Sequence, residues 1–341
     1  MNLIEINNLY PTELDAIKLF EKIRWNNVPT CPYCKSKDLS KRNKDYRFNC
    51  KSCKKSFSVT TDTFLHNTRL PLKTWLYSFA LVSDAKKGIS AMQLSRNLGL
   101  HYETAWVISH KLRELMIEPI ELNGIVEMDE TYVGGKPRYN TPKTTRDTRK
   151  FPELDDKLKE YSDFKFKKGA YKKPYRETQS KRGRGTDKIA VTGIVQRNGD
   201  VIASVLSNTT HSELKKMVKK YVDMPDSILL TDEYRSYNRF DSIMKHIEID
   251  HNTLYSYKGI NTNSIESFWA IVKRGILGTY HHVSEKYLQN YVDEFCFKYN
   301  NRKIDDMFET LLINSMMPLG KKLKRVSTVS KSNEHYLENI K

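Results

Sequence analysis

The sequence predicts an α/β protein in which a sheet domain follows a small cysteine-rich module and a helical region. Two pairs of cysteines, each spaced C-x2-C, lie near the N-terminus. Residues 71–114 then have the apolar spacing of helices, whereas the central part of the chain contains short β-rich runs. We therefore divide the chain into four parts, which are residues 1–66, 67–119, 120–318 and a basic tail, 319–341.

The composition indicates a polyanionic partner. Among 341 residues, 58 lysines and arginines stand against 41 acidic residues, which gives a net charge of +17. Such an excess favours phosphate binding, although a merely soluble basic protein of the ribosomal type also fits. No apolar run is long enough to span a bilayer, and the first ten residues lack the pattern of a signal peptide. We expect a cytoplasmic protein with no membrane partner.

The cysteine pairs predict a structural zinc site. Cys31, Cys34, Cys50 and Cys53 form the pattern C-x2-C-x15-C-x2-C. Zn²⁺ prefers four such ligands in a tetrahedron, and each pair can supply two thiolates to one ion. Four free thiols or two disulfides remain the alternatives. Lysines at positions 35, 37, 51, 54 and 55 add a surface suited to phosphate.

The helical region contains a candidate helix-turn-helix. Helices are expected over residues 12–24 and 71–86, and again over 88–114 with an interruption at Gly99. A glycine turn between short helices is typical of a DNA-reading unit and also of an ordinary helical hairpin. The second helix is expected to expose Glu103, Thr104, Ser109, His110 and Lys111. The candidate DNA contacts are Tyr102, Thr104, His110, Lys111 and Arg113.

The sheet domain is predicted from a change of period. Residues 125–133 alternate as a strand, and two β-rich runs, 189–195 and 201–206, are joined through Asn198-Gly199, a strong hairpin signal. A short apolar run at 227–231 predicts a strand buried on both faces. Helices are expected at 211–222, where Thr210 and Glu213 have capping-box spacing, and near 264–277 and 285–300. Cys296 falls on an apolar helix face and is expected in the core.

A long basic segment interrupts this domain. Residues 136–187 contain 17 basic and 8 acidic side chains and few aliphatic ones. We interpret the segment as an insertion in the sheet domain. A solvated loop and a direct phosphate contact are both open for it and for the basic tail.

Three acids form a candidate catalytic constellation. Asp129 lies on the first predicted strand, Asp232 ends the buried strand, and Glu266 lies on an amphipathic helix. Oxygen ligands suit Mg²⁺, and a pair of such ions about 4 Å apart can drive phosphoryl transfer on DNA. Lys273, seven residues after Glu266, would face phosphate. Taken singly, each acid is more often an ordinary surface group.

Several longer blocks resemble one protein family. MDETYVGGK, TDEYRSYN and NTNSIESFWAIVKRGILGTYHHVS closely resemble blocks of DDE transposases from insertion sequences that carry an N-terminal zinc ribbon. The segments CPYC…CKSCKKSFSVTTDTFLHNTRLPL and RGRGTDK are similar to the same family, so the resemblance runs from about residue 15 to 315.

The resemblance implies an RNase-H-like catalytic domain. It assigns Asp129 and Asp232 as metal-binding aspartates and Glu266 as the third ligand, with Asn263 as the alternative because some relatives use asparagine nearby. Lys273 matches the basic residue that follows the triad. Arg274, His281 and His282 are expected as DNA contacts, and for the two histidines a local structural role is also open.

Together these observations predict a transposase. We expect it to bind double-stranded DNA at the element's terminal inverted repeats and at the target. Two Mg²⁺ or Mn²⁺ ions would serve catalysis, and a homodimer or a higher synaptic assembly would bring the ends together. The alternatives are a non-catalytic DNA-binding regulator and a nuclease without strand transfer.

Overall fold

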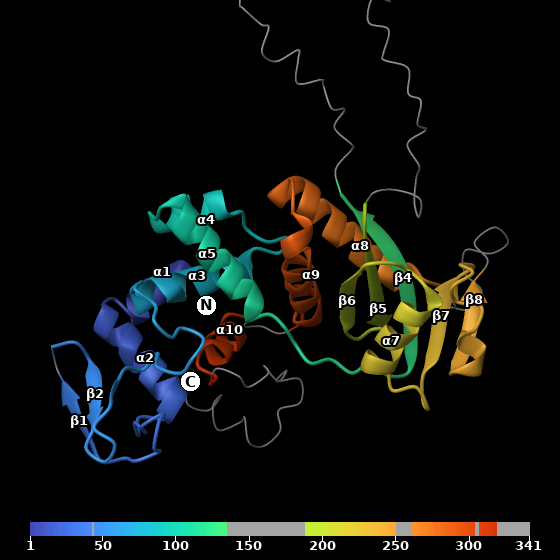
Figure 1. Cartoon of the computed structure of the whole chain (residues 1–341). Helices are drawn as coiled ribbons and strands as arrows, with labels where there is room; N and C mark the ends of the chain where they lie inside the picture. Colours follow the sequence, from blue (N-terminus) through green and yellow to red (C-terminus); the bar gives the residue numbers. More distant parts are fainter. Residues whose placement is uncertain (43, 135–187, 250–260, 304–306, 319–341) are drawn as a thin grey trace, which may run out of the picture. The chain divides into compact units, whose positions relative to one another are not determined.

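The computed structural model describes residues 1–42, 44–134, 188–249, 261–303 and 307–318. These residues form a small three-stranded sheet, a helical core and a five-stranded sheet with its own helices (Figure 1). Tyr132–Lys188 makes up a separate unit, and most of it, with the predicted insertion 136–187, lies outside the described residues. The predicted tail, 319–341, also lies outside them. None of the described helices has the length and apolar character needed to cross a membrane.

The N-terminal sheet contains β1 (Leu39–Arg42), β2 (Arg47–Cys50) and β3 (Ser56–Phe57), which are antiparallel neighbours in this order. The helix predicted at 12–24 is α2 (Glu13–Trp25), and Thr12 begins it with a capping box. Trp25, at the end of α2, packs edge-on against Phe48 and Phe57. These rings and two of the cysteines form the core of a sheet too small to bury much else.

The helical core contains α1 (Leu3–Leu9), α2, α3 (Leu72–Asp84), α4 (Ala91–Leu98), α5 (Tyr102–Glu114) and α10 (Met307–Ser315). The helices predicted at 71–86 and 88–114 are therefore present. The expectation that the sheet domain extends to residue 318 is wrong for α10. Phe308 of α10 packs against Phe79 of α3, and its apolar neighbours join the same cluster. The last described helix thus completes the core that the first helices begin.

The large sheet contains β4 (Ile125–Val133), β5 (Ile189–Gln196), β6 (Val201–Leu206), β7 (Ile228–Asp232) and β8 (Lys245–Ile249). Its strand order is β6-β5-β4-β7-β8. The hairpin predicted through Asn198-Gly199 joins β5 to β6, and β7 lies parallel to both β4 and β8. This arrangement is that of an RNase-H-like domain. It places β4 and β7, the first and fourth strands of the domain in chain order, side by side.

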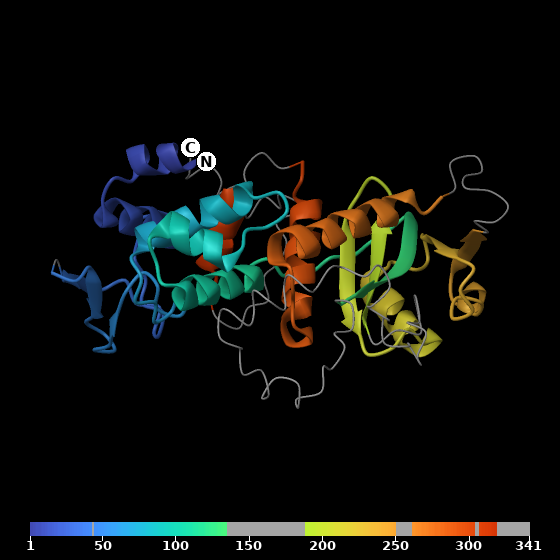
Figure 2. The same ribbon diagram turned by 90° about the horizontal axis from the view of Figure 1, so that it is seen from above.

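Helices cover both faces of this sheet (Figure 2). On one face, α7 (His211–Tyr221) packs against Val126 and Met128 of β4. On the other lies α8 (Asn263–Gly275), followed by the π-helix η4 (Ile276–Tyr280) and by α9 (Glu285–Asn300). The close approach of α8 depends on Gly193 of β5, where a Cβ atom would meet Trp269 at 2.8 Å.

The predicted capping box at the start of α7 is wrong. Thr210 precedes the helix, but its side chain makes no capping hydrogen bond to the first turn. The Thr210 hydroxyl instead donates to Asn208 Oδ1 at 2.7 Å. The Thr210 hydroxyl therefore stabilises a local turn and does not cap the helix as the spacing predicted.

The edge strand β6 is covered by side chains of α9. The amide of Asn300 accepts from Val201 N and donates to Val201 O, as a neighbouring strand would. Gln289 makes the same pair of bonds with Val205 N and Ala203 O. These amides satisfy backbone groups that otherwise invite pairing with another chain. Cys296, on the same helix, is buried as expected.

Candidate functional site

Asp129 lies on the face of β4 that is turned toward α8. Alternation along the strand puts Val126 and Met128 in the apolar core on the α7 side. Asp129 therefore projects to the opposite side, together with Glu127, which contacts the first turn of α8. The sequence prediction for the direction of Asp129 agrees with this placement.

Asp232 lies at the end of β7, beside β4 in the sheet. Because the two strands are parallel, their carboxyl ends point to the same edge, where α/β sheets place their ligands. Asp232 Oδ1 accepts a hydrogen bond from Tyr234 N at 3.2 Å, which turns the chain directly after the strand. The carboxylate stays partly exposed.

Glu266 lies in the first turn of α8 and is exposed. Its Oε1 accepts a 3.3 Å hydrogen bond from Thr262 Oγ1. Asn263, the alternative third ligand, is exposed at the first position of the helix. Lys273 and Arg274 are exposed in the last turn. The helix thus carries an acidic start and a basic end along one element.

The charges of Asp232 and Glu266 both act on Asp129. Burial is the largest influence on Asp129 and raises its pKa to about 6, and the charges of Asp232 and Glu266 raise it further. The Trp269 indole N–H opposes this shift, although no hydrogen bond of standard geometry joins it to Asp129. The parallel pairing of β4 with β7 therefore brings Asp129 and Asp232, which are more than 100 positions apart, to neighbouring strands. A bound cation is the natural partner for such a cluster of negative charge.

The oxygen donors fit divalent cations of the Mg²⁺ type. Among the described residues, ligand atoms lie within 4.8 Å of one another in the cysteine cluster, and the three carboxylates do not form so tight a group. A pair of ions about 4 Å apart requires a wider spread of ligands than one tetrahedral ion does. The donor set is hard and anionic, as Mg²⁺ and Mn²⁺ prefer.

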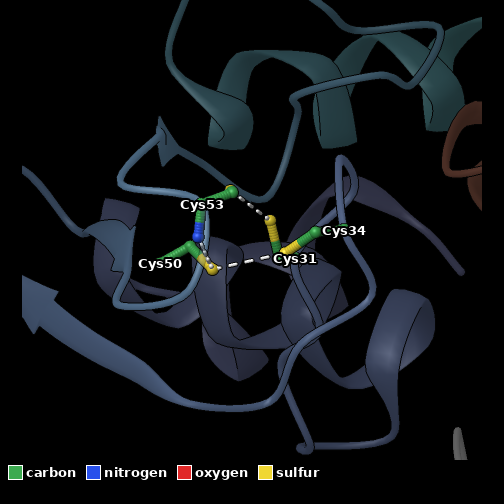
Figure 3. Close-up of side chains that lie close together, drawn as sticks. All are labelled: Cys31, Cys34, Cys50 and Cys53. Atoms are coloured by element: carbon green, nitrogen blue, oxygen red, sulfur yellow. Dashed lines mark hydrogen bonds between the residues drawn. The ribbon is translucent and has the colours of Figure 1, made fainter.

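The four cysteines form a compact thiol cluster (Figure 3). Cys31 Sγ lies 3.7 Å from Cys53 Sγ, and Cys34 Sγ lies 3.5 Å from Cys50 Sγ. Neither distance is that of a disulfide, and all four thiols are free. The backbone N–H of Cys53 lowers the pKa of Cys50 to about 6, which favours thiolate at neutral pH. Donor type and spacing fit tetrahedral Zn²⁺.

Two short helices joined at Gly99 occupy the region of the candidate helix-turn-helix. Ser90 caps α4 by accepting from Gln93 N, and Gly99 ends the helix with φ +65°, in the left-handed region. Helix α5 then begins at Tyr102, which is exposed, whereas Thr104 and Lys111 are partly buried.

The predicted exposure of Ser109 and His110 is wrong, because both are buried, and Arg113, a candidate DNA contact, is buried as well. The His110 ring packs at a tilt between Trp106 and Tyr287, with ring centroids 4.2 and 4.6 Å away, and burial lowers its pKa to about 4. Arg113 Nε donates to Glu294 Oε2 of α9 at 2.8 Å. This face of α5 packs inside the protein and cannot contact DNA in this conformation.

His281 and His282 follow the π-helix and are both exposed. His281 has φ +59°, in the left-handed region that is unfavourable for residues other than glycine. Its Nδ1 lies 3.1 Å from Leu277 O. Just before them, Tyr280 is held by Glu294 through a 2.8 Å hydrogen bond. The block therefore combines a fixed tyrosine with two histidines open to solvent.

Two buried carboxylates near the acids were not predicted as functional. Glu127 accepts hydrogen bonds from the first turn of α8, and Glu130 accepts one from the Tyr237 phenol at 2.7 Å. Both belong to the block VEMDE that contains Asp129. An acidic residue inside a predicted strand indicates a buried carboxylate with a special partner. The partners of Glu127 and Glu130 could not be named from the sequence, because they lie far along the chain.

The fold and the site define a zinc-ribbon protein with an RNase-H-like α/β domain, and comparisons with known proteins agree. Residues 164–300 match the ISXO2-like transposase domain, and residues 11–56 match a transposase zinc-ribbon domain. A "transposase-like protein" of Haemophilus influenzae is 30% identical over 112 residues, which cover 33% of this chain and 89% of that protein. The chain belongs to the ISXO2-like transposase family of insertion sequences.

A further relative is a protein in the transposable element ISH50 of Halobacterium salinarum. It is 30% identical over 129 residues, which cover 36% of this chain and 43% of the halobacterial protein. Among solved structures, a pre-cleavage Mos1 transpososome gives 13% identity, a TM-score of 0.27 and coverage of 73% of this chain and 79% of that chain. A simian T-cell lymphotropic virus intasome gives 13% identity, a TM-score of 0.26 and coverage of 64% and 66%.

Proposed function

We propose that this protein is an active transposase that binds the terminal inverted repeats of an insertion sequence, cleaves at its ends and joins the 3′-hydroxyls to target DNA. The observation that supports the proposal most is the placement of Asp129 and Asp232 on two parallel neighbouring strands, with the charges of both Asp232 and Glu266 acting on Asp129. Such a cluster of acids in a protein of this family fits phosphoryl transfer better than a purely structural role.

The three acids would hold two Mg²⁺ or Mn²⁺ ions. When bound, the ions activate the attacking hydroxyl and stabilise the leaving oxygen. The role of the protein chain is to hold the three carboxylates in position. Asp129 is held on a central strand and Asp232 at the tip of its neighbour, while Glu266 rests on the first turn of α8. Lys273 would contact a phosphate, and Asn263 remains the alternative third ligand.

DNA recognition would fall to the N-terminal half of the chain. Lysines at positions 35, 37, 51, 54 and 55 are exposed around the cysteine cluster, and α4 and α5, joined by the turn at Gly99, would form the helix-turn-helix. Tyr102, Thr104 and Lys111 would contact DNA from α5, and Arg274, His281 and His282 from the sheet domain. Because two ends must be joined, the active species would be a dimer or a larger assembly.

The decisive experiment compares three aspartate variants on a labelled terminal fragment with Mg²⁺. Asp129→Asn and Asp232→Asn should each abolish cleavage while DNA binding is kept, because the metal ligands are lost and the N-terminal half is intact. Asp226→Asn is the matched control. Asp226 is exposed just before β7, near the end of the strand opposite to Asp232, so this variant should cleave normally.

The outcomes separate the rival functions. Strand transfer by Asp129→Asn would rule out the assigned site. Cleavage by the wild-type protein without joined products would indicate a nuclease. DNA binding without any Mg²⁺-dependent cleavage would indicate a regulator that uses the sheet domain as a scaffold.

A further inference from the structure

Glu127 is a fully buried carboxylate in the centre of the sheet domain. It lies on β4 two residues before Asp129 and on the same face of the strand. Its Oε2 accepts from Ser264 N at 2.9 Å and from Ile265 N at 3.1 Å, and its Oε1 accepts from Ser264 Oγ at 3.0 Å. All three donors belong to the first turn of α8, which also carries Glu266.

Glu127 therefore caps α8 from a different element. The residue before the helix, Thr262, makes no capping hydrogen bond of its own. The amides that Glu127 binds are those of the second and third helical residues, which a local cap normally satisfies. A negative charge at this end is also favoured by the helix dipole. The start of α8 is thus fixed to β4.

Arg197 fixes the same junction from the end of the β5–β6 hairpin. Its Nε and Nη2 both donate to Glu127 Oε1 at 3.1 Å, and Nη2 also donates to Asn261 O at 2.8 Å. Asn261 lies just before α8, so the guanidinium holds the carboxylate and the chain that enters the helix. Burying such an ion pair is costly, and apolar residues often stabilise a fold at least as well. Stability alone therefore gives little reason for this arrangement.

The geometry suggests a reason. Side chains two residues apart on a strand are separated by about 7 Å, so Glu127 is, with Thr131, one of the two nearest same-face neighbours of Asp129 along β4. On the helix, Ile265 directly precedes Glu266. The hydrogen bonds of Glu127 thus set the height and the register of the turn of α8 that carries Glu266, over the face of β4 that carries Asp129.

We propose that Glu127 is a positioning residue that sets the separation of Asp129 and Glu266, and through it the affinity of the acidic cluster for divalent cations. This inference rests on the proposed function of that cluster. A residue that supports metal ligands in this way typically changes metal affinity by about 10–100-fold when it is replaced. A residue that only stabilises the fold does not.

The test uses the full-length, zinc-loaded chain and measures Mn²⁺ binding by titration calorimetry, with Asp232→Asn to identify the heat that belongs to the acidic cluster. Glu127→Gln keeps the shape of the side chain but turns an N–H group toward the Arg197 and α8 donors. We expect its Mn²⁺ affinity to fall about 10-fold or more. Hydrogen exchange at the amides of Ser264 and Ile265 should become faster in the same variant.

Glu13→Gln is the matched control. Glu13 also caps a distant helix, because it accepts from Leu72 N at 2.6 Å and Lys73 N at 3.0 Å at the start of α3, in the helical core. Its replacement should lower stability without changing Mn²⁺ affinity. If Glu127→Gln fails to fold, Arg197→Lys keeps the charge but cannot bridge Glu127 and Asn261, and it should weaken Mn²⁺ binding as well.

Unchanged Mn²⁺ affinity in folded Glu127→Gln, or in Arg197→Lys where the first variant does not fold, would overturn the inference and leave Glu127 as a structural cap. Wild-type protein that binds no Mn²⁺ at the acidic cluster would overturn it too. Failure of the proposed function looks different. In that case the wild-type chain binds Mn²⁺ at the acids and the variant binds it weakly, but neither cleaves terminal DNA.

Discussion

The Tyr237 phenol donates a 2.7 Å hydrogen bond to Glu130, and both side chains are buried. Tyr237 lies five residues after Asp232, whereas Glu130 directly follows Asp129 on β4. Burial is the largest influence on the Tyr237 hydroxyl and raises its pKa well above the ordinary value, and the charge of Glu130 acts in the same direction. The phenol therefore remains a donor at any physiological pH and joins the segment after β7 to β4.

Tyr237→Phe should destabilise the sheet domain without disturbing its packing. The change leaves the ring in place but removes the hydroxyl donor from a buried carboxylate, at a cost of about 1–3 kcal/mol in the free energy of unfolding. Urea denaturation measures this cost. Tyr234→Phe is the control, because the Tyr234 hydroxyl is only partly buried and lies 3.2 Å from Thr209 Oγ1. Equal losses in the two variants would contradict a special role for the buried bond.

Local signals were enough to predict most of the sheet. The strand predicted at 125–133 has the bounds of β4, and the Asn-Gly turn correctly joined β5 to β6. Alternation also gave the direction of Asp129. In each case the determining interactions lie within a few residues, so the sequence displays them directly. The edge strand β8 was missed because KHIEI is short and mostly exposed.

Distant partners explain the errors. Arg113 and His110 resemble surface residues of a helix, but their neighbours Glu294 and Tyr287 are on α9, far along the chain. The cap on α8 could not be predicted either, because Glu127 precedes Ser264 by 137 positions. Such contacts depend on how α8 and α9 pack, which no local pattern encodes. They are also the contacts that hold the candidate site.

The cysteine cluster should bind one zinc ion that maintains the N-terminal sheet. Cys50→Ser removes a ligand and should lower the zinc content from about one ion per chain to nearly none, because structural sites require all four ligands. Elemental analysis of purified protein measures the content. Cys296→Ala is the control, since Cys296 lies buried on α9 outside the cluster and its loss should leave zinc bound. Full zinc content in Cys50→Ser would count against the assignment.

The two faces of α5 should respond differently to substitution. Lys111→Ala removes a candidate phosphate contact, so the salt dependence of binding to terminal DNA should become shallower by about 0.9 in log–log slope. His110→Ala instead leaves a cavity beside Trp106 and Tyr287, so it should lower the melting temperature and leave the slope unchanged. Fluorescence anisotropy over a range of salt concentrations checks both. A changed slope in His110→Ala would show that the buried face opens on DNA.

The ion pairs of Glu294 should make stability depend on pH in the acid range. Burial opposes ionisation of this carboxyl, but Lys298 and Arg113 outweigh it and lower its pKa from 4.5 to about 2. A folded-state pKa below the unfolded value means that the stabilisation is complete above about pH 5 and is lost as the pH falls toward 2. Glu294→Gln leaves both cations without their counter-charge, which costs about 3–5 kcal/mol at pH 7.

The stability difference between wild type and Glu294→Gln, measured by urea unfolding, should therefore shrink at pH 3. Zinc release at low pH affects both proteins alike and cancels in the difference. Glu21→Gln, whose partner Lys41 is exposed, should cost less than about 1 kcal/mol. A difference for Glu294→Gln that stays constant from pH 7 to pH 3 would mean that the carboxyl does not titrate as the geometry indicates.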